Sequence, residues 1–227
     1  MIRNNIIDSI IHIKFNNNSG TGFAVVINDC HYIITANHIV KGMDIGGEIE
    51  YYQNNEWNRM RVNVAPIKYY EMDIAVLIPD RLIREPLKLN IGANGIALSQ
   101  DVYFVGFPYG MMGELSPKKD GFPLPLIKKG ILSTLLTEKK GKLTLIIDGF
   151  NNPGFSGGPV VYKHLRNNNL NIASVISGYQ QEEKKILFNE KETELKYIQN
   201  TGIIITYGLD SIKEELCQNP CGFIQKQ

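Results

Sequence analysis

The chain has 227 residues, of which 43% are hydrophobic and 21% charged, and its formal net charge is +1. This apolar content is too high for a disordered chain, and the length suits one large or two small folding units. The near-neutral charge provides no basic field for nucleic acid or an anionic membrane. No apolar run reaches the roughly 20 residues of a membrane-spanning helix, and the N-terminal residues lack a secretory-signal pattern. We therefore expect a cytoplasmic protein that binds neither nucleic acid nor membrane.

Cysteine usage predicts neither a disulfide framework nor a metal site. Three cysteines, Cys30, Cys217 and Cys221, are an odd number and cannot all pair with one another. Cys217 and Cys221 lie close together, but no histidine is near them in sequence to complete a zinc site. We expect free thiols, no metal ion and no organic cofactor.

Short β-rich runs separated by turn-forming residues recur along the chain. In chain order the predicted strands are 10–15, 23–27, 32–35, 61–64, 74–78, 101–105, 143–147, 159–162, 173–177 and 202–206. This regular spacing predicts an all-β sandwich or barrel. A single helix is expected over 212–216, capped by Asp210 or Ser211.

Two stretches interrupt the strand pattern, and a seam between two β-halves is expected near 86–95. Residues 106–130 contain four prolines and five glycines, which predicts a loop. Residues 180–200 are dense in mixed charge, which predicts a solvated hairpin or loop. A regulatory or partner-binding insertion at 180–200 stays open as the alternative.

The segment from Asn152 to Pro159 carries the strongest chemical signal, because it places Ser156 among three glycines. A serine nucleophile needs a base to take its proton and donors for the oxyanion that forms on attack. The N–H groups of Gly154 and Ser156 could form that donor pair, although an ordinary Gly-rich turn is the alternative. The nucleophile elbow of α/β-hydrolases is disfavoured, because only His164 follows the serine.

A histidine and an aspartate precede this serine in a meaningful order. His38 lies where a predicted strand gives way to a turn, and Asp73 directly precedes an apolar strand. Either residue alone fits an ordinary structural role. Together, the chain order His38, Asp73, Ser156 is that of the chymotrypsin-type triad.

The chain resembles the trypsin-like serine peptidases, and most of all their bacterial HtrA-like branch, over roughly residues 8–216. The motifs that carry the resemblance are 19–23, 34–40, 73–77, 105–110, 130–133, Asp148 and 152–159. The resemblance implies two six-stranded antiparallel β-barrels followed by a short C-terminal helix. It places these in one peptidase domain, 1–227, with barrels at about 5–88 and 89–207 and the helix and tail at about 208–227.

The resemblance also implies roles for the site residues. His38 would act as general base and then acid, Asp73 would orient it, and Ser156 would attack the peptide bond to form an acyl-enzyme. The N–H groups of Gly154 and Ser156 would form the oxyanion hole. The implied function is hydrolysis of proteins or peptides, with regulation by a partner protein left open. Two alternatives remain, a catalytically silent binding module on the same fold and a processing peptidase dedicated to one substrate.

Two departures from the family limit what can be carried over. Digestive trypsins have an aspartate before the serine that pairs with a new N-terminus, whereas this chain has Phe155. We therefore expect no activation by N-terminal processing. After residue 206 too few residues remain for a PDZ domain, so PDZ-driven regulation is not expected.

Family positions for the substrate pocket map onto two segments. They are Phe150, Asn151 and Asn152 before the serine, and Val175, Ile176, Ser177 and Gly178 after it. No acidic residue stands at the pocket base matched by Phe150, so selection for lysine or arginine is not expected. We expect a small or medium apolar residue before the scissile bond, and a substrate strand that pairs with residues 175–178.

Overall fold

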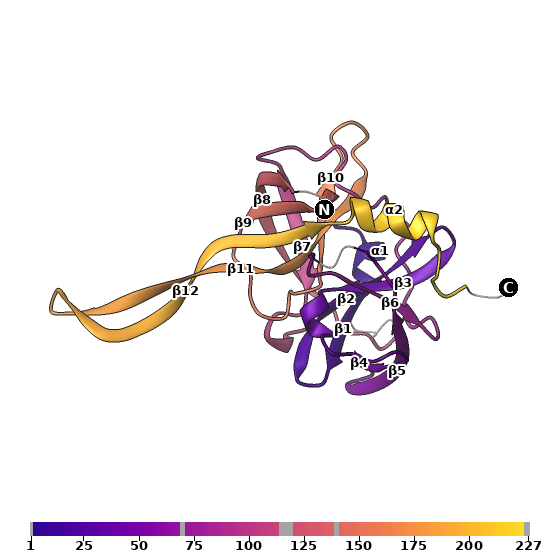
Figure 1. Cartoon of the computed structure of the whole chain (residues 1–227), viewed down its shortest axis with the longest axis horizontal. Coiled ribbons are helices and arrows are strands. Elements are labelled where there is room, and N and C mark those ends of the chain that lie inside the picture. The colour runs from indigo at the N-terminus through magenta and orange to yellow at the C-terminus, as the bar shows by residue number, and fades with distance from the viewer. Residues whose placement is uncertain (1, 69–70, 114–119, 139–140, 225–227) are drawn as a thin grey trace.

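The computed structural model describes residues 2–68, 71–113, 120–138 and 141–224. Within these ranges, twelve strands form two closed six-stranded antiparallel barrels, so the predicted two-barrel fold is confirmed (Figure 1). The first barrel contains β1 (Ile10–Phe15), β2 (Asn18–Ile27), β3 (Cys30–Thr35), β4 (Glu48–Gln53), β5 (Glu56–Val64) and β6 (Ala75–Pro79). The second contains β7 (Asp101–Gly106), β8 (Leu126–Thr137), β9 (Leu143–Asp148), β10 (Pro159–Lys163), β11 (Leu170–Phe188) and β12 (Lys191–Gly208). The assignment of 1–227 to one peptidase domain stays a prediction.

Each barrel is closed by hydrogen bonds between the two strands at the ends of its sheet. β1 pairs with β4 in the first barrel, and β10 pairs with β7 in the second. Three apolar clusters support this arrangement. Two fill the barrels, and the third joins Phe23 of the first barrel to Phe107 and to Leu216 of the C-terminal helix. Burial of this shared cluster fixes the barrels against each other.

Helices are short and lie outside the barrel walls. They are α1 (Asn4–Ile7), η1 (Asn37–Ile39), η2 (Pro108–Gly110) and α2 (Asp210–Gln218). The predicted C-terminal helix is confirmed, but its predicted cap is wrong. Leu209 is the N-cap residue and makes no side-chain cap bond. The Asp210 carboxylate instead accepts the Ala93 N–H, at 3.1 and 3.0 Å, and so ties the helix to the segment between the barrels.

Several elements differ from the sequence-based expectation. β4, β8 and α1 were not predicted, and β8 begins inside the stretch 106–130 that was expected to be a loop. Residues 114–119 of that stretch, and 225–227 of the predicted tail, lie outside the described residues. β2 begins at Asn18 rather than at 23, because a tight turn pairs Asn18 directly with Phe15.

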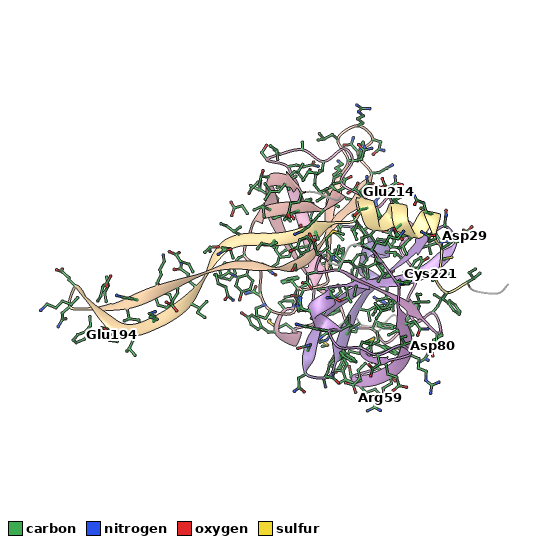
Figure 2. All side chains as sticks on the ribbon, in the orientation of Figure 1. Asp29, Arg59, Asp80, Glu194, Glu214 and Cys221 are labelled. Atoms are coloured by element: carbon green, nitrogen blue, oxygen red, sulfur yellow. The ribbon has the colours of Figure 1, made fainter. Side chains whose placement is uncertain are left out.

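Residues 180–200 form an antiparallel hairpin, as predicted, and it projects far from the barrels (Figure 1). We call this hairpin, from Gln180 to Asn200, the arm. Its tip is a two-residue turn in which Asn189 and Glu190 both have positive φ, 47° and 64°. That geometry matches the twist of the flanking strands. Side chains on the arm, such as Glu194, contact only the arm's own strands or solvent over much of its length (Figure 2). No helix among the described residues is long and apolar enough to cross a membrane.

Candidate active site

His38 and Asp73 meet at the end of the first barrel. β3 and β6 are neighbours, with Thr35 paired to Ala75, so the segments after β3 and before β6 emerge together. The His38 N–H donates to Asp73 Oδ1 at 2.8 Å, and His38 Nδ1 lies 2.6 Å from Asp73 Oδ2. An ionised carboxylate only accepts hydrogen bonds, so Nδ1 donates in this contact, and in the neutral tautomer of the ring Nε2 keeps its lone pair. The backbone contact and the ring contact together fix the imidazole on the carboxylate.

The Asp73 carboxylate is held in its charged form. Burial alone would raise its pKa, but hydrogen bonds from His38 and from Ser177 outweigh burial and hold the pKa below its usual value. The Ser177 hydroxyl donates to Asp73 Oδ2 at 2.6 Å. Its carbonyl accepts the Ser156 hydroxyl at 3.1 Å. Ser177 was expected only to line a substrate pocket, and its contacts with both Asp73 and Ser156 were not foreseen.

A backbone hydrogen bond joins Ser156 to the first barrel. The Thr21 N–H donates to the Ser156 carbonyl at 2.8 Å. The next residue, Gly157, has φ +83°, and a Cβ there would overlap the Thr21 carbonyl and the Thr35 hydroxyl. Glycine is therefore required by both conformation and space. The Ser156 hydroxyl points to Ser177, and no hydrogen bond joins it to His38 among the described residues.

Hydrogen bonds to backbone carbonyl groups fix the loop formed by residues 152–155. The Pro153 carbonyl accepts the Tyr109 N–H at 2.7 Å. Because a trans peptide points its N–H away from its carbonyl, this bond sets the direction of the Gly154 N–H. Gly154 has φ +103°, and a Cβ there would overlap the Phe107 carbonyl. Within the described residues, neither the Gly154 N–H nor the Ser156 N–H donates a hydrogen bond. In the part of the chain that the structure describes, both donors are therefore available to an oxyanion.

Thr21 is a site residue that the sequence analysis missed. Its hydroxyl is fully buried, donates to the Gly154 carbonyl at 2.7 Å and accepts the Phe107 N–H at 3.1 Å. One side chain of the first barrel therefore joins the loop that precedes Ser156 to the segment that follows β7. Thr21 stands within the quoted motif 19–23, but no local pattern relates it to residues more than 80 positions away.

The predicted pocket residues are only partly brought together. The side chains of Val175 and Ile176 are fully buried in the apolar clusters and cannot line a pocket. Their backbone is also occupied, because Val175 pairs with Pro159 and Tyr207 on its two sides. The expected pairing of substrate with 175–178 is therefore wrong at 175 and 176. The unpaired edge of β11 begins at Ser177. A Cβ added to Gly178 would meet no atom within 4 Å, so the space next to this residue is open.

The other predicted pocket segment, 150–152, is contacted by the Lys128 side chain, which the sequence analysis did not identify. Phe150 is 55% exposed, whereas Asn151 is buried and its carbonyl accepts the Asn200 side chain at 2.7 Å. The Lys128 ammonium donates to the Phe150 carbonyl and, at 3.1 Å, to Asn152 Oδ1. It lies 5.3 Å from the centre of the Phe150 ring, and burial lowers its pKa. No carboxylate among the described residues pairs with it.

Phe155 occupies the position before the serine as an apolar core residue. Its ring is fully buried and packs edge-on against Phe104, with centroids 5.0 Å apart. A Cβ on Gly106 would lie 3.0 Å from the Phe155 ring, so the ring fits closely against the end of β7, within the apolar cluster of the second barrel. The loop is thus held by packing where digestive trypsins use a charged pair.

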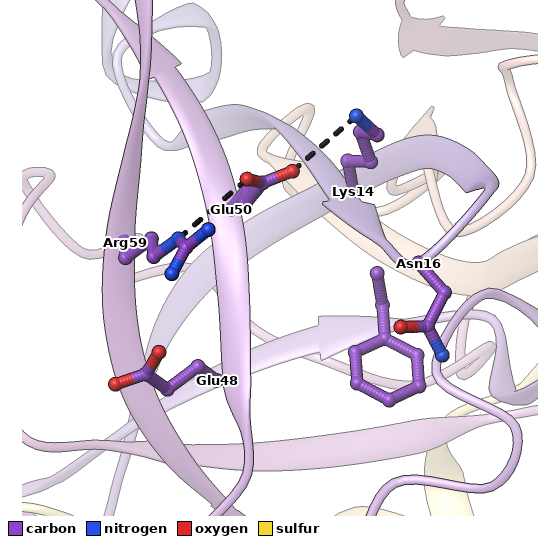
Figure 3. A pocket seen from close by; sticks show the side chains of 6 residues that line it. Lys14, Asn16, Glu48, Glu50 and Arg59 are labelled. Atoms are coloured by element: carbon purple, nitrogen blue, oxygen red, sulfur yellow. Dashed lines mark ion pairs between the residues drawn. The ribbon is translucent and has the colours of Figure 1, made fainter.

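Charged clusters elsewhere do not form a second catalytic site. A hollow on the first barrel is lined by Lys14, Asn16, Glu48, Glu50 and Arg59 (Figure 3). Glu50 pairs with Lys14 at 3.4 Å and with Arg59 at 3.7 Å, so the charges satisfy one another. Among the described residues, no group of three or more His, Cys, Asp or Glu side chains is placed to hold a metal ion.

The sequence was compared with models of protein families. Residues 20–166 match the trypsin-like peptidase domain family, a match that covers more than half of the chain. The chain belongs to this family. It is thereby a serine endopeptidase by class, and the match spans the segments that carry His38, Asp73 and Ser156. The individual roles of these three residues, of Gly154 and of the pocket residues stay predictions. No match was found among curated protein sequences.

Solved structures of proteases share the fold at low sequence identity. The Rv3671c protease of M. tuberculosis, in an inactive form, aligns with a TM-score of 0.59 and 17% identity, covering 95% of this chain and 91% of that one. The serine endoprotease from Yersinia pestis aligns with a TM-score of 0.58 and 18% identity, covering 96% and 68%. The HtrA-type protease AlgW, solved with a tripeptide, gives 0.60 and 17%, covering 93% of this chain. This chain spans 60% of AlgW. The expected similarity to HtrA-type peptidases is confirmed at the level of fold.

Proposed function

We propose that this trypsin-like peptidase cleaves peptide bonds in protein substrates through an acyl-enzyme on Ser156. The observation that carries the proposal is the connected set His38, Asp73, Ser177 and Ser156. Asp73 accepts hydrogen bonds from His38 and Ser177, and Ser177 in turn accepts the Ser156 hydroxyl. This set spans both barrels and shares its loop with the N–H groups of Gly154 and Ser156, which have no acceptor within the described residues.

The proposed reaction starts with rotation of the Ser156 side chain away from the Ser177 carbonyl. His38 Nε2 then takes the hydroxyl proton while Asp73 stabilises the imidazolium that forms. Ser156 Oγ attacks the substrate carbonyl, and the N–H groups of Gly154 and Ser156 receive the oxyanion. His38 returns the proton to the leaving amine. After the amine has left, His38 takes a proton from water, whose oxygen attacks the acyl carbonyl, and then returns that proton to Ser156 Oγ as the carboxylic acid product leaves.

We propose that substrate pairs with β11 from Ser177 outward and that lysine or arginine before the scissile bond is disfavoured. Support comes from the open space at Gly178 and from the Lys128 ammonium beside Phe150 and Asn152. A cationic substrate side chain there would face a like charge without a carboxylate to offset it. An apolar side chain would meet the exposed face of Phe150.

Labelling with a fluorophosphonate probe tests the proposal directly. The probe reacts with a serine only where a base activates it and oxyanion donors are in place. We expect one labelled peptide containing Ser156, no labelling of Ser156→Ala, and strongly reduced labelling of His38→Ala. A peptide library should then show little cleavage after lysine or arginine. A folded chain that never reacts would contradict the proposal.

One observation favours a catalytically silent or latent scaffold as the second candidate. Ser156 Oγ is engaged by the Ser177 carbonyl rather than by His38. A latent enzyme should gain labelling when a partner or substrate binds, whereas a silent binding module should gain none. Labelling repeated in the presence of unfolded protein substrates distinguishes the two.

A further inference from the structure

The arm continues the strand edge on which the proposed nucleophile lies. β10 accompanies β11 only as far as the pair Pro159–Val175. The last bonds on that side join Ile176 to Gly157 and Gly158. From Ser177 outward, β12 is the only strand that pairs with β11 in the described part of the chain. One edge of β11 is therefore unpaired from the active site to the tip of the arm.

One residue, Ser177, is inserted in β11, between the pairs Ile176–Thr206 and Gly178–Ile205. Beyond Gly178 the free edge is regular, and the remaining irregularities of the ladder fall on β12. Between the pairs Tyr179–Ile204 and Gln181–Asn200 the extra residues belong to β12. The same is true nearer the tip, between Lys185–Lys196 and Leu187–Glu192. β11 thus runs without an inserted residue from Gly178 to Phe188, about 33 Å at the usual rise of a strand. Such an edge is a template for another extended chain.

The backbone ladder between β11 and β12 keeps the arm extended, and cross-strand side-chain contacts add to it. Lys196 pairs with Glu183 at 2.6 Å, and Lys185 pairs with Glu192 at 2.7 Å. The Thr193 hydroxyl donates to the Ile186 carbonyl at 2.8 Å. These contacts join β11 to β12 and leave the outer edge of β11 available. A pre-extended arm reduces the ordering cost of pairing with an extended peptide.

The distal part of this edge is apolar. Ile186, Leu187 and Phe188 are consecutive on β11 and are 40%, 64% and 70% exposed. Three adjacent exposed apolar side chains on a projecting hairpin mark an interaction surface rather than scattered surface residues. The proximal part, from Glu182 to Lys185, has two acidic residues followed by two basic residues and suits a polar segment.

We propose that the arm is an extended substrate-binding edge, which pairs with the polypeptide upstream of the scissile bond. The inference rests on the proposed function, and its occupant follows from continuity with the edge at Ser177. Antiparallel pairing places the substrate's N-terminal side along the arm, because β11 runs outward from the site. Ile186 to Phe188 then face substrate residues about nine to eleven positions upstream of the cleaved bond, at one residue per strand position. The preferred substrate is an unfolded chain with an apolar stretch at that distance.

Peptide length tests the inference in two enzymes. A short peptide carries four residues on each side of the cleaved bond, and a long one extends it to twelve upstream residues with an apolar stretch at the far end. In the shortened enzyme, Glu182 is joined to Gln199 by an Asn-Gly turn, since these residues face each other in the ladder. We expect the intact enzyme to favour the long peptide by about tenfold or more in kcat/KM, and the shortened enzyme to lose that preference.

Matched variants localise the effect to β11. Leu187→Lys should reduce the preference for the long peptide, and Leu195→Lys should not, although the two side chains are 64% and 66% exposed. N-methylation at alternate upstream positions of the peptide should weaken cleavage in only one of the two alternating sets, since strand pairing uses every second N–H.

Each outcome decides a separate point. Equal preference in the intact and shortened enzymes, with Ser156 still labelled in both, would overturn the arm inference and leave the proposed function standing. Loss of a dimer on shortening, without a length effect, would assign the edge to a second copy and also overturn it. Absence of labelling in the intact chain would overturn the proposed function and this inference together.

Discussion

Residues 152–156, which lead to the proposed nucleophile, are called the serine loop. Replacement of Thr21 by valine should remove the hydrogen bonds that hold this loop while keeping the apolar packing of the Thr21 side chain. Valine has nearly the same shape as threonine but lacks the hydroxyl. The variant therefore keeps the fully buried methyl packing and removes the bonds to the Gly154 carbonyl and the Phe107 N–H. The Thr21 backbone bond to Ser156 is unaffected.

The size of the effect follows from the two bonds. Loss of a buried hydrogen bond costs about 1 kcal/mol, and more when the remaining partner is left without water. We expect Thr21→Val to lower the free energy of unfolding by about 2–3 kcal/mol, a loss that a domain of ordinary stability survives. Thr21→Ser keeps the hydroxyl and removes one methyl group, so it should lose only about 1 kcal/mol.

Urea unfolding and fluorophosphonate labelling measure the two consequences. The labelling rate of Thr21→Val should fall by about tenfold or more, because no hydroxyl then holds the Gly154 carbonyl and, with it, the loop that carries the proposed oxyanion donors. Thr21→Ser should label at nearly the parental rate. If the valine and serine variants proved equal in both measurements, the argument that the Thr21 hydroxyl holds the serine loop would be wrong.

Three further predictions use the same assays. Gly154→Ala forces a Cβ against the Phe107 carbonyl at φ +103°, so it should abolish labelling and lower the urea midpoint. Asp73→Asn should reduce the labelling rate roughly 10³- to 10⁴-fold with little change in fold, because His38 loses the carboxylate that stabilises its charged form. His12 is buried and its pKa is lowered from 6.5 to about 4. The unfolded chain therefore binds a proton that the folded chain does not, and stability should fall by about 3 kcal/mol as the pH drops through that range. Urea unfolding of His12→Phe at about pH 5 and pH 7 should show a smaller difference than the parent.

Those features of the fold that depend on local pattern could be predicted from sequence. Runs such as 10–15 and 101–105 carry β-branched residues between turn formers, and the structure has strands there. β4 was missed because its run Glu48–Gln53 mixes glutamates with aromatic residues and has only one β-branched residue. β8 was missed because prolines and glycines just before Leu126 dominate the composition of the window.

In the candidate site, too, residues in local motifs could be predicted from sequence, whereas residues that act through long-range contacts could not. His38, Asp73 and Ser156 stand in short motifs, so residue type and order were enough to nominate them. Thr21 and Lys128 act on the serine loop through contacts between distant segments, which no local pattern reports. The burial of Val175 and Ile176 was likewise hidden, because alternation along a strand does not reveal that both of its faces meet apolar clusters.

The division of the site between the barrels has a consequence for biosynthesis. His38 and Asp73 belong to the first barrel, whereas Ser156 and Ser177 belong to the second. Translation delivers the first barrel first, and units of this kind fold in the order in which they leave the ribosome. The proposed acid–base pair can therefore assemble before the proposed nucleophile has been synthesised. The nascent chain is incapable of the proposed hydrolysis, toward itself or its neighbours, until the second barrel has closed.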